Sequence, residues 1–309
     1  MPSVLVRYRN GEVRSQTLQG IFRGLDWDRR NGGLVLVGDA GRILKLADGR
    51  MLAINSGTRQ NLRAISIAQD DGAILIVGNS GTAILVDESG RQVRLELSTT
   101  ENLRTVVWRP NGNEALIAGN GGTLLKYSKT NLEAVGNARA NLRRVSWHPQ
   151  GSNALVTSNC FAEEFVPSPN LFVFNSGDRN LSPANEGRVD LIGADWKPDG
   201  RSALVVGYDV IWHNGFIGIF DGSNLSPIGF DSKRIYPVTV SWSCSNDMAA
   251  IATATTQPGF GQGILYLWNA GNLRPIFASD RYFFSTVAWD HEGIELAALA
   301  SSATRAFNC

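Results

Sequence analysis

Short apolar runs separated by polar turns recur along the whole chain. Residues 34–37 and 203–206 are two such runs, and both lead into turns rich in glycine, asparagine or aspartate. Short runs of this kind between turn residues are typical of β-strands. The pattern therefore predicts a protein built from many short strands.

A tryptophan that returns at regular intervals divides the chain into repeats. Successive spacings are 40, 41, 39, 49, 46 and 47 residues when Ile67 is counted in the second repeat. The residues before the first tryptophan and after the last one together amount to one further repeat, so seven repeats account for the chain. We call Ile67 and the repeated tryptophans the anchor residues; the tryptophans are Trp27, Trp108, Trp147, Trp196, Trp242 and Trp289.

Each repeat carries four strand signals. The first strand ends at the anchor residue, and a Trp-x-Pro-polar-Gly turn follows it, as at residues 108–112. A short apolar second strand leads into a Gly-polar-x-Gly turn, as at residues 38–41, and the third strand ends in a bulky residue. Continuous apolar strands are buried on both faces of a sheet, whereas the more polar fourth strand is typical of an exposed outer edge.

Four strands in each repeat of this length predict the fold. We expect an all-β protein, a seven-bladed β-propeller with four antiparallel strands per blade, which forms a single domain over residues 1–309. Because one repeat is split between the chain ends, the N-terminal strands in residues 3–16 should complete the blade begun at residues 280–309. That closure leaves no free sheet edge between the first and last blades.

The repeats resemble two known groups of propeller. They are similar to WD repeats in their length and in the Pro-Asp-Gly turn after the first strand, as at residues 198–200. They also resemble the propeller of the photosystem II stability/assembly factor family, in which a Gly-x-x-Gly turn precedes an apolar strand. The Gly-His dipeptide of WD repeats is missing, and Trp268-Asn269 stands in place of their Trp-Asp dipeptide. The resemblance implies a propeller without the buried hydrogen-bonded tetrad of WD repeats.

Composition and charge narrow the class of protein. Apolar residues make up 43% of the chain and charged residues 18%, so the chain can bury a large core. A net charge of +1 argues against a protein that coats nucleic acid. The chain has no apolar stretch near the roughly 20 residues of a membrane helix and no signal-peptide pattern at its start. We therefore expect a cytoplasmic protein without a membrane or nucleic-acid partner.

The cysteines point to the same compartment. Cys160, Cys244 and Cys309 are too few and too scattered for a disulfide framework or a zinc site built from cysteines. We expect free thiols, which are typical of a reducing compartment.

An arginine stands four residues before the anchor residue in each of the first four repeats. The position opens the innermost strand, so the four side chains should crowd one arc around the channel mouth. Cations that close repel one another by about 1 kcal/mol or more each, so they need acceptors. The four are Arg23, Arg63, Arg104 and Arg143, and the last three of these lie in the string Asn-Leu-Arg.

Two interpretations of these arginines stay open. In the first, each arginine bonds the Gly-Asp or Gly-Asn turn of its own repeat, at Asp39, Asn79, Asn120 or Asn159. In the second, the guanidinium groups bind an anion or the acidic segment of a partner, because a planar guanidinium suits two-point recognition of carboxylates and phosphates.

The connection between the second and third strands is longer in repeats four to six. From the anchor residue to the bulky end of the third strand is 19 residues in the first three repeats and 27, 24 and 26 in these. In the propellers that the chain resembles, this connection lies on the partner-binding face. Packing of the added aromatic side chains on one another is the structural alternative. The candidate binding residues in these loops are Phe161, Phe165, Tyr208, Trp212, His213 and Phe260.

Catalytic chemistry has little support in the sequence. His148 and His291 lie in the first turns of distant repeats and His213 lies in a long loop, so the three histidines cannot form one metal site. Cys160 and His213 come from neighbouring long loops, which leaves a nucleophile pair conceivable. Neither a phosphate-binding loop nor a serine elbow is present.

Two acidic residues directly precede their anchor tryptophans. Asp26 and Asp195 could face the channel, as inward acids do in calcium-dependent propeller lactonases. Salt bridges or turn hydrogen bonds are the simpler role for both.

The leading hypothesis is a non-catalytic scaffold that binds a protein or peptide, including one with an acidic segment, over the loop-rich face around the channel mouth. We expect neither a cofactor nor a metal. Two alternatives stay open, a propeller hydrolase or lactonase with a metal at the channel mouth and a binder of small anions.

Overall fold

The structure is a computed structural model of the chain. It describes residues 1–30, 32–87, 89–110, 112, 114–129, 131–159, 167–177, 179–209, 212–230, 234–245, 247–255 and 263–302. Within these residues the regular structure is strand throughout, apart from two single turns of 3-10 helix, η1 (Asp39–Gly41) and η2 (Asn120–Gly122).

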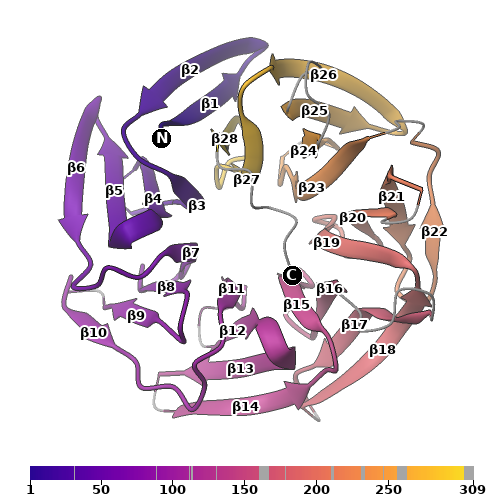
Figure 1. Ribbon diagram of the computed structural model, residues 1–309, viewed down its shortest axis with the longest axis horizontal. Helices are drawn as coiled ribbons and strands as arrows, with labels where there is room; N and C mark the ends of the chain where they lie inside the picture. The colour runs from indigo at the N-terminus through magenta and orange to yellow at the C-terminus, as the bar shows by residue number, and fades with distance from the viewer. Residues whose placement is uncertain are drawn as a thin grey trace. The chain divides into compact units, whose positions relative to one another are not determined.

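The strands form seven antiparallel sheets of four strands each, which are the seven blades of a β-propeller (Figure 1). In blades one to six the four strands follow one another along the chain. Blade one holds β3 (Phe22–Trp27), β4 (Leu34–Gly38), β5 (Arg42–Ala47) and β6 (Arg50–Asn55); blade two holds β7 (Leu62–Ile67), β8 (Ile74–Gly78), β9 (Ala83–Val86) and β10 (Gln92–Arg94); blade three holds β11 (Leu103–Trp108), β12 (Glu114–Gly119), β13 (Thr123–Ser128) and β14 (Asn131–Asn137).

The remaining blades repeat this plan, and the predicted all-β fold with seven blades of four antiparallel strands is confirmed. Blade four holds β15 (Asn141–Trp147), β16 (Asn153–Asn159), β17 (Ser168–Asn175) and β18 (Asn180–Gly187); blade five holds β19 (Val189–Trp196), β20 (Ala203–Asp209), β21 (Asn214–Phe220) and β22 (Leu225–Pro227); blade six holds β23 (Ile235–Trp242), β24 (Ala249–Thr255), β25 (Gly263–Asn269) and β26 (Asn272–Ser279); blade seven holds β27 (Phe283–Trp289), β28 (Glu295–Ser301), β1 (Ser3–Arg9) and β2 (Glu12–Leu18).

The chain divides into two compact units. One contains Met1–Ile21, Thr157–Leu171 and Pro183–Cys309, and the other contains Phe22–Val156 and Phe172–Ser182. Blades one to three lie in the second of these units and blades five to seven in the first, while blade four has strands in both. The single domain over residues 1–309 stays a prediction.

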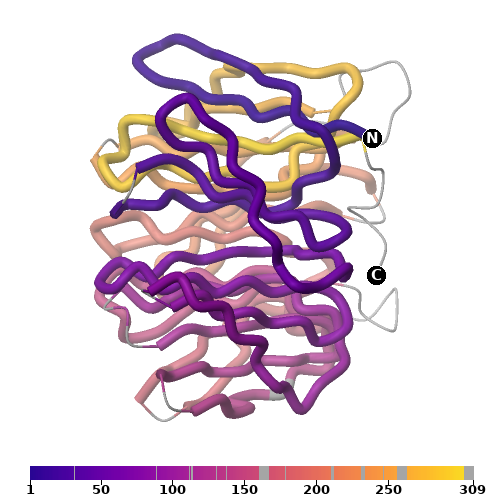
Figure 2. The backbone as a smooth tube through the Cα atoms, turned by 90° about the vertical axis from the view of Figure 1, so that its left-hand side faces the viewer, coloured from indigo at the N-terminus to yellow at the C-terminus, as the bar shows by residue number. Residues whose placement is uncertain are grey.

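Blade seven joins the two ends of the chain. β1 pairs with β28 from Ser3 opposite Ser301 to Arg9 opposite Glu295, and β2 pairs with the other edge of β1. Arg7 Nε donates a hydrogen bond to a carboxylate oxygen of Glu295 across this pairing. Figure 2 shows the indigo N-terminal strands beside the yellow C-terminal strands. The predicted closure is confirmed, and β2 continues past the predicted segment to Leu18.

An aromatic pair fills the core at one end of each of blades three to seven. The anchor tryptophans there are only 5% to 8% exposed. Each ring meets, nearly at right angles, the aromatic ring at the end of the third strand, which is a favourable edge-to-face geometry. The ring centroids are 5.3 to 6.5 Å apart in the pairs Trp108–Tyr127, Trp147–Phe174, Trp196–Phe220, Trp242–Trp268 and Trp289–Tyr8.

The anchor tryptophans also tie successive blades together. The indole Nε1 of Trp108 donates to the carbonyl oxygen of Ser66 at 3.1 Å, and that of Trp147 donates to the carbonyl oxygen of Val107 at 3.2 Å. Trp289 donates in the same way to Ser241 at 3.1 Å. Each acceptor directly precedes the anchor residue of the preceding blade, so one repeated position supplies the bond.

The side chain at that same position makes a second tie. An Asp26 carboxylate oxygen accepts the backbone N–H of Ile67 at 2.8 Å, and an Asp195 carboxylate oxygen accepts that of Trp242 at 2.8 Å. Ser66 Oγ accepts the backbone N–H of Trp108 at 3.1 Å. Asp26 and Asp195 thus bind the anchor residue of the next blade, a role that the sequence alone does not indicate.

Burial changes the acidity of Asp26. Its side chain is partly buried, and the resulting desolvation is the main cause that raises the pKa of Asp26 to about 6. The hydrogen bonds from the Ile67 and Trp27 amides and the charges of Arg29 and Arg144 act in the opposite direction. A carboxylate without a directly bonded cation is costly to bury, so desolvation prevails.

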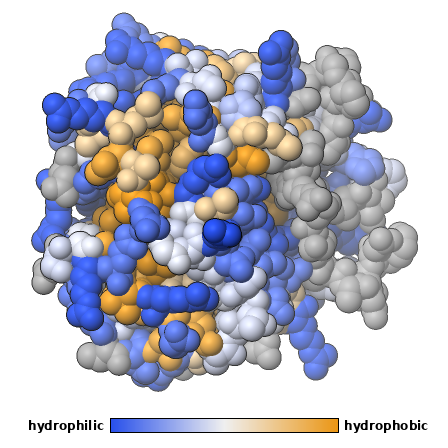
Figure 3. Space-filling model, turned by 60° about the vertical axis from the view of Figure 1, so that its left-hand side comes forward, coloured by the Kyte–Doolittle hydropathy of each residue, from blue (hydrophilic) through white to orange (hydrophobic). Residues whose placement is uncertain are grey.

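The outer strand of blade one departs from the polar outer edge that the sequence predicts. Met51 is 57% exposed and Leu52 is 61% exposed, and β6 pairs only with β5. Figure 3, which views the side that carries β6, shows apolar side chains at the surface. The outer strand β2, by contrast, exposes mostly polar side chains.

Deletion of residues 1–19 tests the closure of blade seven. The deletion removes β1 and β2 and leaves the edge of β28 unpaired, so we expect aggregation or a large drop in melting temperature. Size-exclusion chromatography and thermal unfolding measure both. Glu12→Ala is the control, because it removes only an exposed ion pair with Arg14 and should change stability by about 1 kcal/mol or less. A truncated protein that stays monomeric with an unchanged melting temperature would contradict this closure.

The raised pKa of Asp26 predicts a pH dependence of stability. The folded state binds the Asp26 proton more tightly than the unfolded state, in which the pKa is 3.8. Protonation therefore favours folding, and the contribution of Asp26 to the free energy of unfolding should fall as pH rises from 3.8 to about 6. The fall amounts to about 3 kcal/mol at about 1.4 kcal/mol per pKa unit.

Chemical denaturation of wild type and Asp26→Asn across this pH range measures the effect. The stability of wild type relative to the variant should decrease as pH rises, because the variant has no carboxyl group to titrate there. A carboxyl carbon of Asp26 that titrates in nuclear magnetic resonance spectra at its ordinary pKa would refute the prediction.

Candidate functional site

The turn between the second and third strands places an oxygen acceptor at the same point in blades one to three. Asp39, Asn79 and Asn120 directly follow the second strand of their blades. The last glycine of the turn has a positive φ, which is 72° at Gly122, and a Cβ there would lie 1.7 Å from the carbonyl oxygen of Ala138. Only glycine fits this position. The Gly-polar-x-Gly pattern therefore fixes where the acceptor lies.

The asparagine of the Asn-Leu-Arg string binds the turn of the preceding blade. Asn61 Oδ1 accepts the backbone N–H of Ala40 at 3.0 Å, and Asn102 Oδ1 accepts that of Ser80 at 3.1 Å. Asn141 repeats the contact on Gly121 at 3.0 Å. The leucine of each string is fully buried. The recurrence of the string is visible in the sequence, but this tie between blades is not.

The arginine of each string binds the turn of its own blade through Nε. Arg63 Nε donates to Asn79 Oδ1 at 2.8 Å, and Arg104 Nε donates to Asn120 Oδ1 at 3.0 Å. In blade one, Arg23 forms a two-point ion pair with Asp39, in which Nη2 lies 2.7 Å from Oδ2. The first interpretation of the arginines, a bond to the turn of their own repeat, is thus what the structure has in blades one to three.

The three acceptors differ in charge. Asp39 neutralises Arg23, whereas Asn79 and Asn120 are neutral amides. Across the described ranges of the chain, neither Arg63 nor Arg104 forms an ion pair, and the hydrogen bonds to Asn79 and Asn120 use Nε alone. Their terminal Nη groups, with four N–H donors on each arginine, are therefore not occupied by these bonds.

The arginines lie close enough to repel one another. Partial burial and, less strongly, the charges of Arg23 and Arg104 together lower the pKa of Arg63 to about 10, against the opposing charge of Asp39. Partial burial, with smaller effects of the charges of Arg143 and Arg23, lowers the pKa of Arg104 to about 10 as well. We call Arg23, Arg63, Arg104 and Arg143 the cationic arc. Arg23, Arg63 and Arg104 are held in place through Nε, and among the described residues no carboxylate forms an ion pair with Arg63 or Arg104.

This arrangement suits the binding of an anion. Guanidinium groups that are partly desolvated and already fixed lose little freedom when they bind a carboxylate or phosphate, and they form strong charge-assisted hydrogen bonds. An anion would also relieve the repulsion between neighbouring arginines.

The long-loop candidates are only partly within the described residues. Tyr208 is a strand residue of β20, 8% exposed, and its ring lies 5.2 Å from that of Tyr236, so it belongs to the core and not to a loop. Trp212 is 73% exposed, and its backbone N–H bonds Asp209. His213 has a positive φ of 53°, and its carbonyl oxygen accepts the Arg234 N–H.

Several further candidate residues lie outside the described residues, and the described ones form no metal site. Phe161, Phe165, Phe260, Cys160 and Cys309 lie outside the described residues. Cys244 is an exposed free thiol in the first turn of blade six. Among the described residues, no three histidine, cysteine or acidic side chains gather in a group that could hold a metal ion. In the same residues, no helix is long and apolar enough to cross a membrane.

A double substitution tests the charge balance of the cationic arc. Asn79→Asp with Asn120→Asp copies the acceptor of blade one, so each new carboxylate should keep the bond from Nε and neutralise its arginine. We expect the melting temperature to rise, by the equivalent of about 1 kcal/mol for two part-buried ion pairs. Asn175→Asp is the control, because Asn175 accepts only the Gly177 N–H. A double variant less stable than this control would show that the arginines are already neutralised.

Comparisons with known proteins show similarity of fold alone. No protein-family model matches the chain, and no curated protein matches its sequence. Hydrazine synthase of Kuenenia stuttgartiensis has a TM-score of 0.70 and 11% identity, over 89% of this chain and 94% of that chain. The β-propeller domain of Myceliophteria thermophila Cps50 (Swd1) has a TM-score of 0.66 and 13% identity, over 93% of this chain and 98% of that chain. The resemblance to WD-repeat propellers is thus confirmed for the fold, and the resemblance to the photosystem II factor family stays a prediction.

Proposed function

We propose that this protein is a non-catalytic scaffold that binds a protein or peptide, and that the cationic arc binds an acidic segment of that partner. The observation that carries the proposal is the neutral acceptor of Arg63 and of Arg104. If bracing of the turns were the whole role of these arginines, aspartate would serve better than asparagine, as it does at Asp39 in blade one.

The electrostatic situation of the arc supports a partner with more than one negative charge. The charges of Arg23 and Arg104 lower the pKa of Arg63, and Asp39 raises it. The charges of Arg143 and Arg23 lower the pKa of Arg104. A segment with two or more acidic side chains would therefore match the surplus charge of the arc.

Other features fit the same function. The exposed indole of Trp212 offers an apolar contact of the kind that is common at protein interfaces. The exposed thiol of Cys244 fits a reducing compartment, and a cytoplasmic location is part of the proposal. A single domain over residues 1–309 is also part of it.

A labelled peptide of eight glutamates tests the acidic segment, with a peptide of eight glutamines as its uncharged match. We expect saturable binding of the glutamate peptide in fluorescence anisotropy, weaker at high salt because screening reduces the attraction. Asn79→Asp with Asn120→Asp should weaken binding about tenfold or more, the scale of a lost charge-assisted hydrogen bond. Arg63→Ala with Arg104→Ala should do the same.

The double asparagine variant separates binding from stability. It should retain or raise the melting temperature while it loses affinity, whereas Asn175→Asp should change neither. Equal affinity of wild type and the double asparagine variant would overturn the role of the arc. Failure of wild type to bind the glutamate peptide, or equal binding of the glutamine peptide, would overturn the acidic segment.

A further inference from the structure

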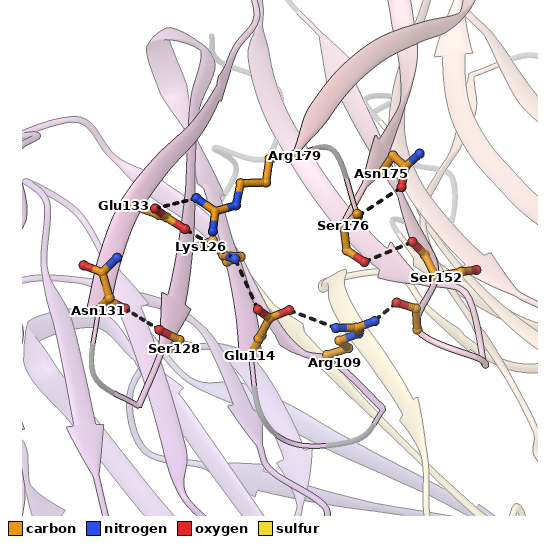
Figure 4. A network of polar contacts seen from close by, with 12 residues as sticks. Arg109, Glu114, Lys126, Ser128, Asn131, Glu133, Ser152, Asn175, Ser176 and Arg179 are labelled. Carbon is orange, nitrogen blue, oxygen red and sulfur yellow. Dashed lines mark hydrogen bonds and ion pairs between the residues drawn. The ribbon is translucent and has the colours of Figure 1, made fainter.

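An ionic network lies beside the first turn of blade three (Figure 4). Arg109 follows the anchor Trp108, its Nε donates to the carbonyl oxygen of Gly151 at 2.8 Å, and its guanidinium lies 5.6 Å from the centre of the Trp147 ring. One carboxylate oxygen of Glu114 lies 3.0 Å from a terminal nitrogen of Arg109, and the other lies 3.1 Å from Lys126 Nζ. The network continues from Lys126 to Glu133 at 3.3 Å and from Glu133 to Arg179 at 3.1 Å.

Blade five has the same backbone but different side chains at these positions. Lys197 follows the anchor Trp196, as Arg109 follows Trp108, and it closes the same turn by a bond from its N–H to the carbonyl oxygen of Ser202. The strand registers place Ser202 where blade three has Glu114, and Ile219 where blade three has Lys126. A small hydroxyl and an apolar side chain therefore stand in blade five where blade three has a carboxylate and an ammonium.

A pocket of about 240 Å³ lies beside this turn of blade five. Six of its nine lining residues are apolar, which is the composition expected of a site for an organic group. A cavity of roughly 150 Å³ can hold benzene, so this volume accommodates a phenyl ring with a short chain. The lining residues are Lys197, Ser202, Ala203, Leu204, Ile219, Trp242, Asp247, Trp268 and Ala270.

Two tryptophans form the aromatic wall of the pocket. The rings of Trp242 and Trp268 stand at 88° with their centroids 5.3 Å apart, and each residue is 8% exposed. The indole N–H groups of both are buried without a hydrogen-bond acceptor in the part of the chain that the structure describes. The aromatic wall is thus short of acceptors, unlike Trp108 and Trp147, whose indole groups bind carbonyl oxygens.

Lys197 supplies the positive charge at the pocket. Its Nζ lies 2.7 Å from a carboxylate oxygen of Asp247, 3.6 Å from one of Asp199 and 5.8 Å from the centre of the Trp242 ring. The Asp247 and Asp199 side chains are 64% and 40% exposed. Ion pairs to carboxylates this exposed contribute little and exchange readily, so another carboxylate can compete for Lys197.

We propose that this pocket binds a carboxylate attached to a flat or branched apolar group. The apolar group would lie against Trp242, Leu204 and Ile219, and the carboxylate would pair with Lys197. Two sources share this chemistry, a free aromatic acid and the C-terminal residue of a peptide that ends in an apolar side chain. The site lies between blades five and six and is independent of the cationic arc.

Two pairs of probes test the proposal and distinguish the sources. The first pair is 3-phenylpropionate and its uncharged amide. The second is a short peptide that ends in phenylalanine, with a free or an amidated C-terminus. Resonances of the indole N–H groups report binding, and Trp242→Phe and Trp268→Phe assign the two signals. We expect saturable shifts of these two signals with the acids and shifts at least about tenfold weaker with the amides, the scale of one charge-assisted hydrogen bond.

Two variants separate the charge from the space. Lys197→Met keeps the approximate length of the side chain and removes the ammonium. It should therefore weaken the binding of the acids about tenfold and leave the binding of the amides unchanged. Ser202→Leu fills the pocket and should abolish binding of all probes. Lys129→Met removes a cation that pairs with Asp71 elsewhere and is the control.

The outcomes are distinct. Binding of 3-phenylpropionate alone assigns the site to small acids, and binding of the free-acid peptide assigns it to C-termini. The absence of saturable shifts with either acid, or equal affinity of wild type and Lys197→Met for both, would overturn the proposal.

Discussion

The buried N–H groups of the anchor residues impose the constraint on which the structure depends. Anchor residues end their strands where the preceding blade packs, and the backbone N–H groups of Ile67, Trp108 and Trp242 and the indole N–H groups of Trp108, Trp147 and Trp289 find acceptors there. The residue before the preceding anchor supplies them, through its carbonyl oxygen to Trp147 and through its side chain to Ile67 and Trp242. One position thus joins successive blades by a short, repeated set of bonds, and Asp26 is partly desolvated as a consequence.

A second repeated position joins the blades at the other end of the same strands. The asparagine of the Asn-Leu-Arg string binds the turn of the preceding blade, and the arginine binds the turn of its own blade. Because the arginine uses Nε for this purpose, its terminal groups stay available for an anion. The structural role of Arg63 and Arg104 is therefore compatible with the binding role that we propose for them, because Asn79 and Asn120 leave their charge unneutralised.

Variation of side chains on one backbone produces local differences between blades. Glu114 and Lys126 form an ion pair in blade three, whereas Ser202 and Ile219, at the corresponding positions of blade five, line a pocket. Propellers commonly keep the strand framework and change what lies at the ends and between the blades. Here both proposed binding sites depend on side chains that differ between blades, and not on the strand framework that all blades share.

The sequence by itself determined the fold, because anchor spacing, turn glycines and apolar runs are local signals that recur seven times. It also located the arginines at one point of each of the first four repeats. Only the tertiary structure decided what each side chain meets: that Tyr208 is buried on Tyr236, that Asp26 binds the next blade, and that Lys197 borders a pocket. These outcomes depend on contacts between residues about one repeat apart, and no local pattern encodes which of two neighbouring blades supplies the partner.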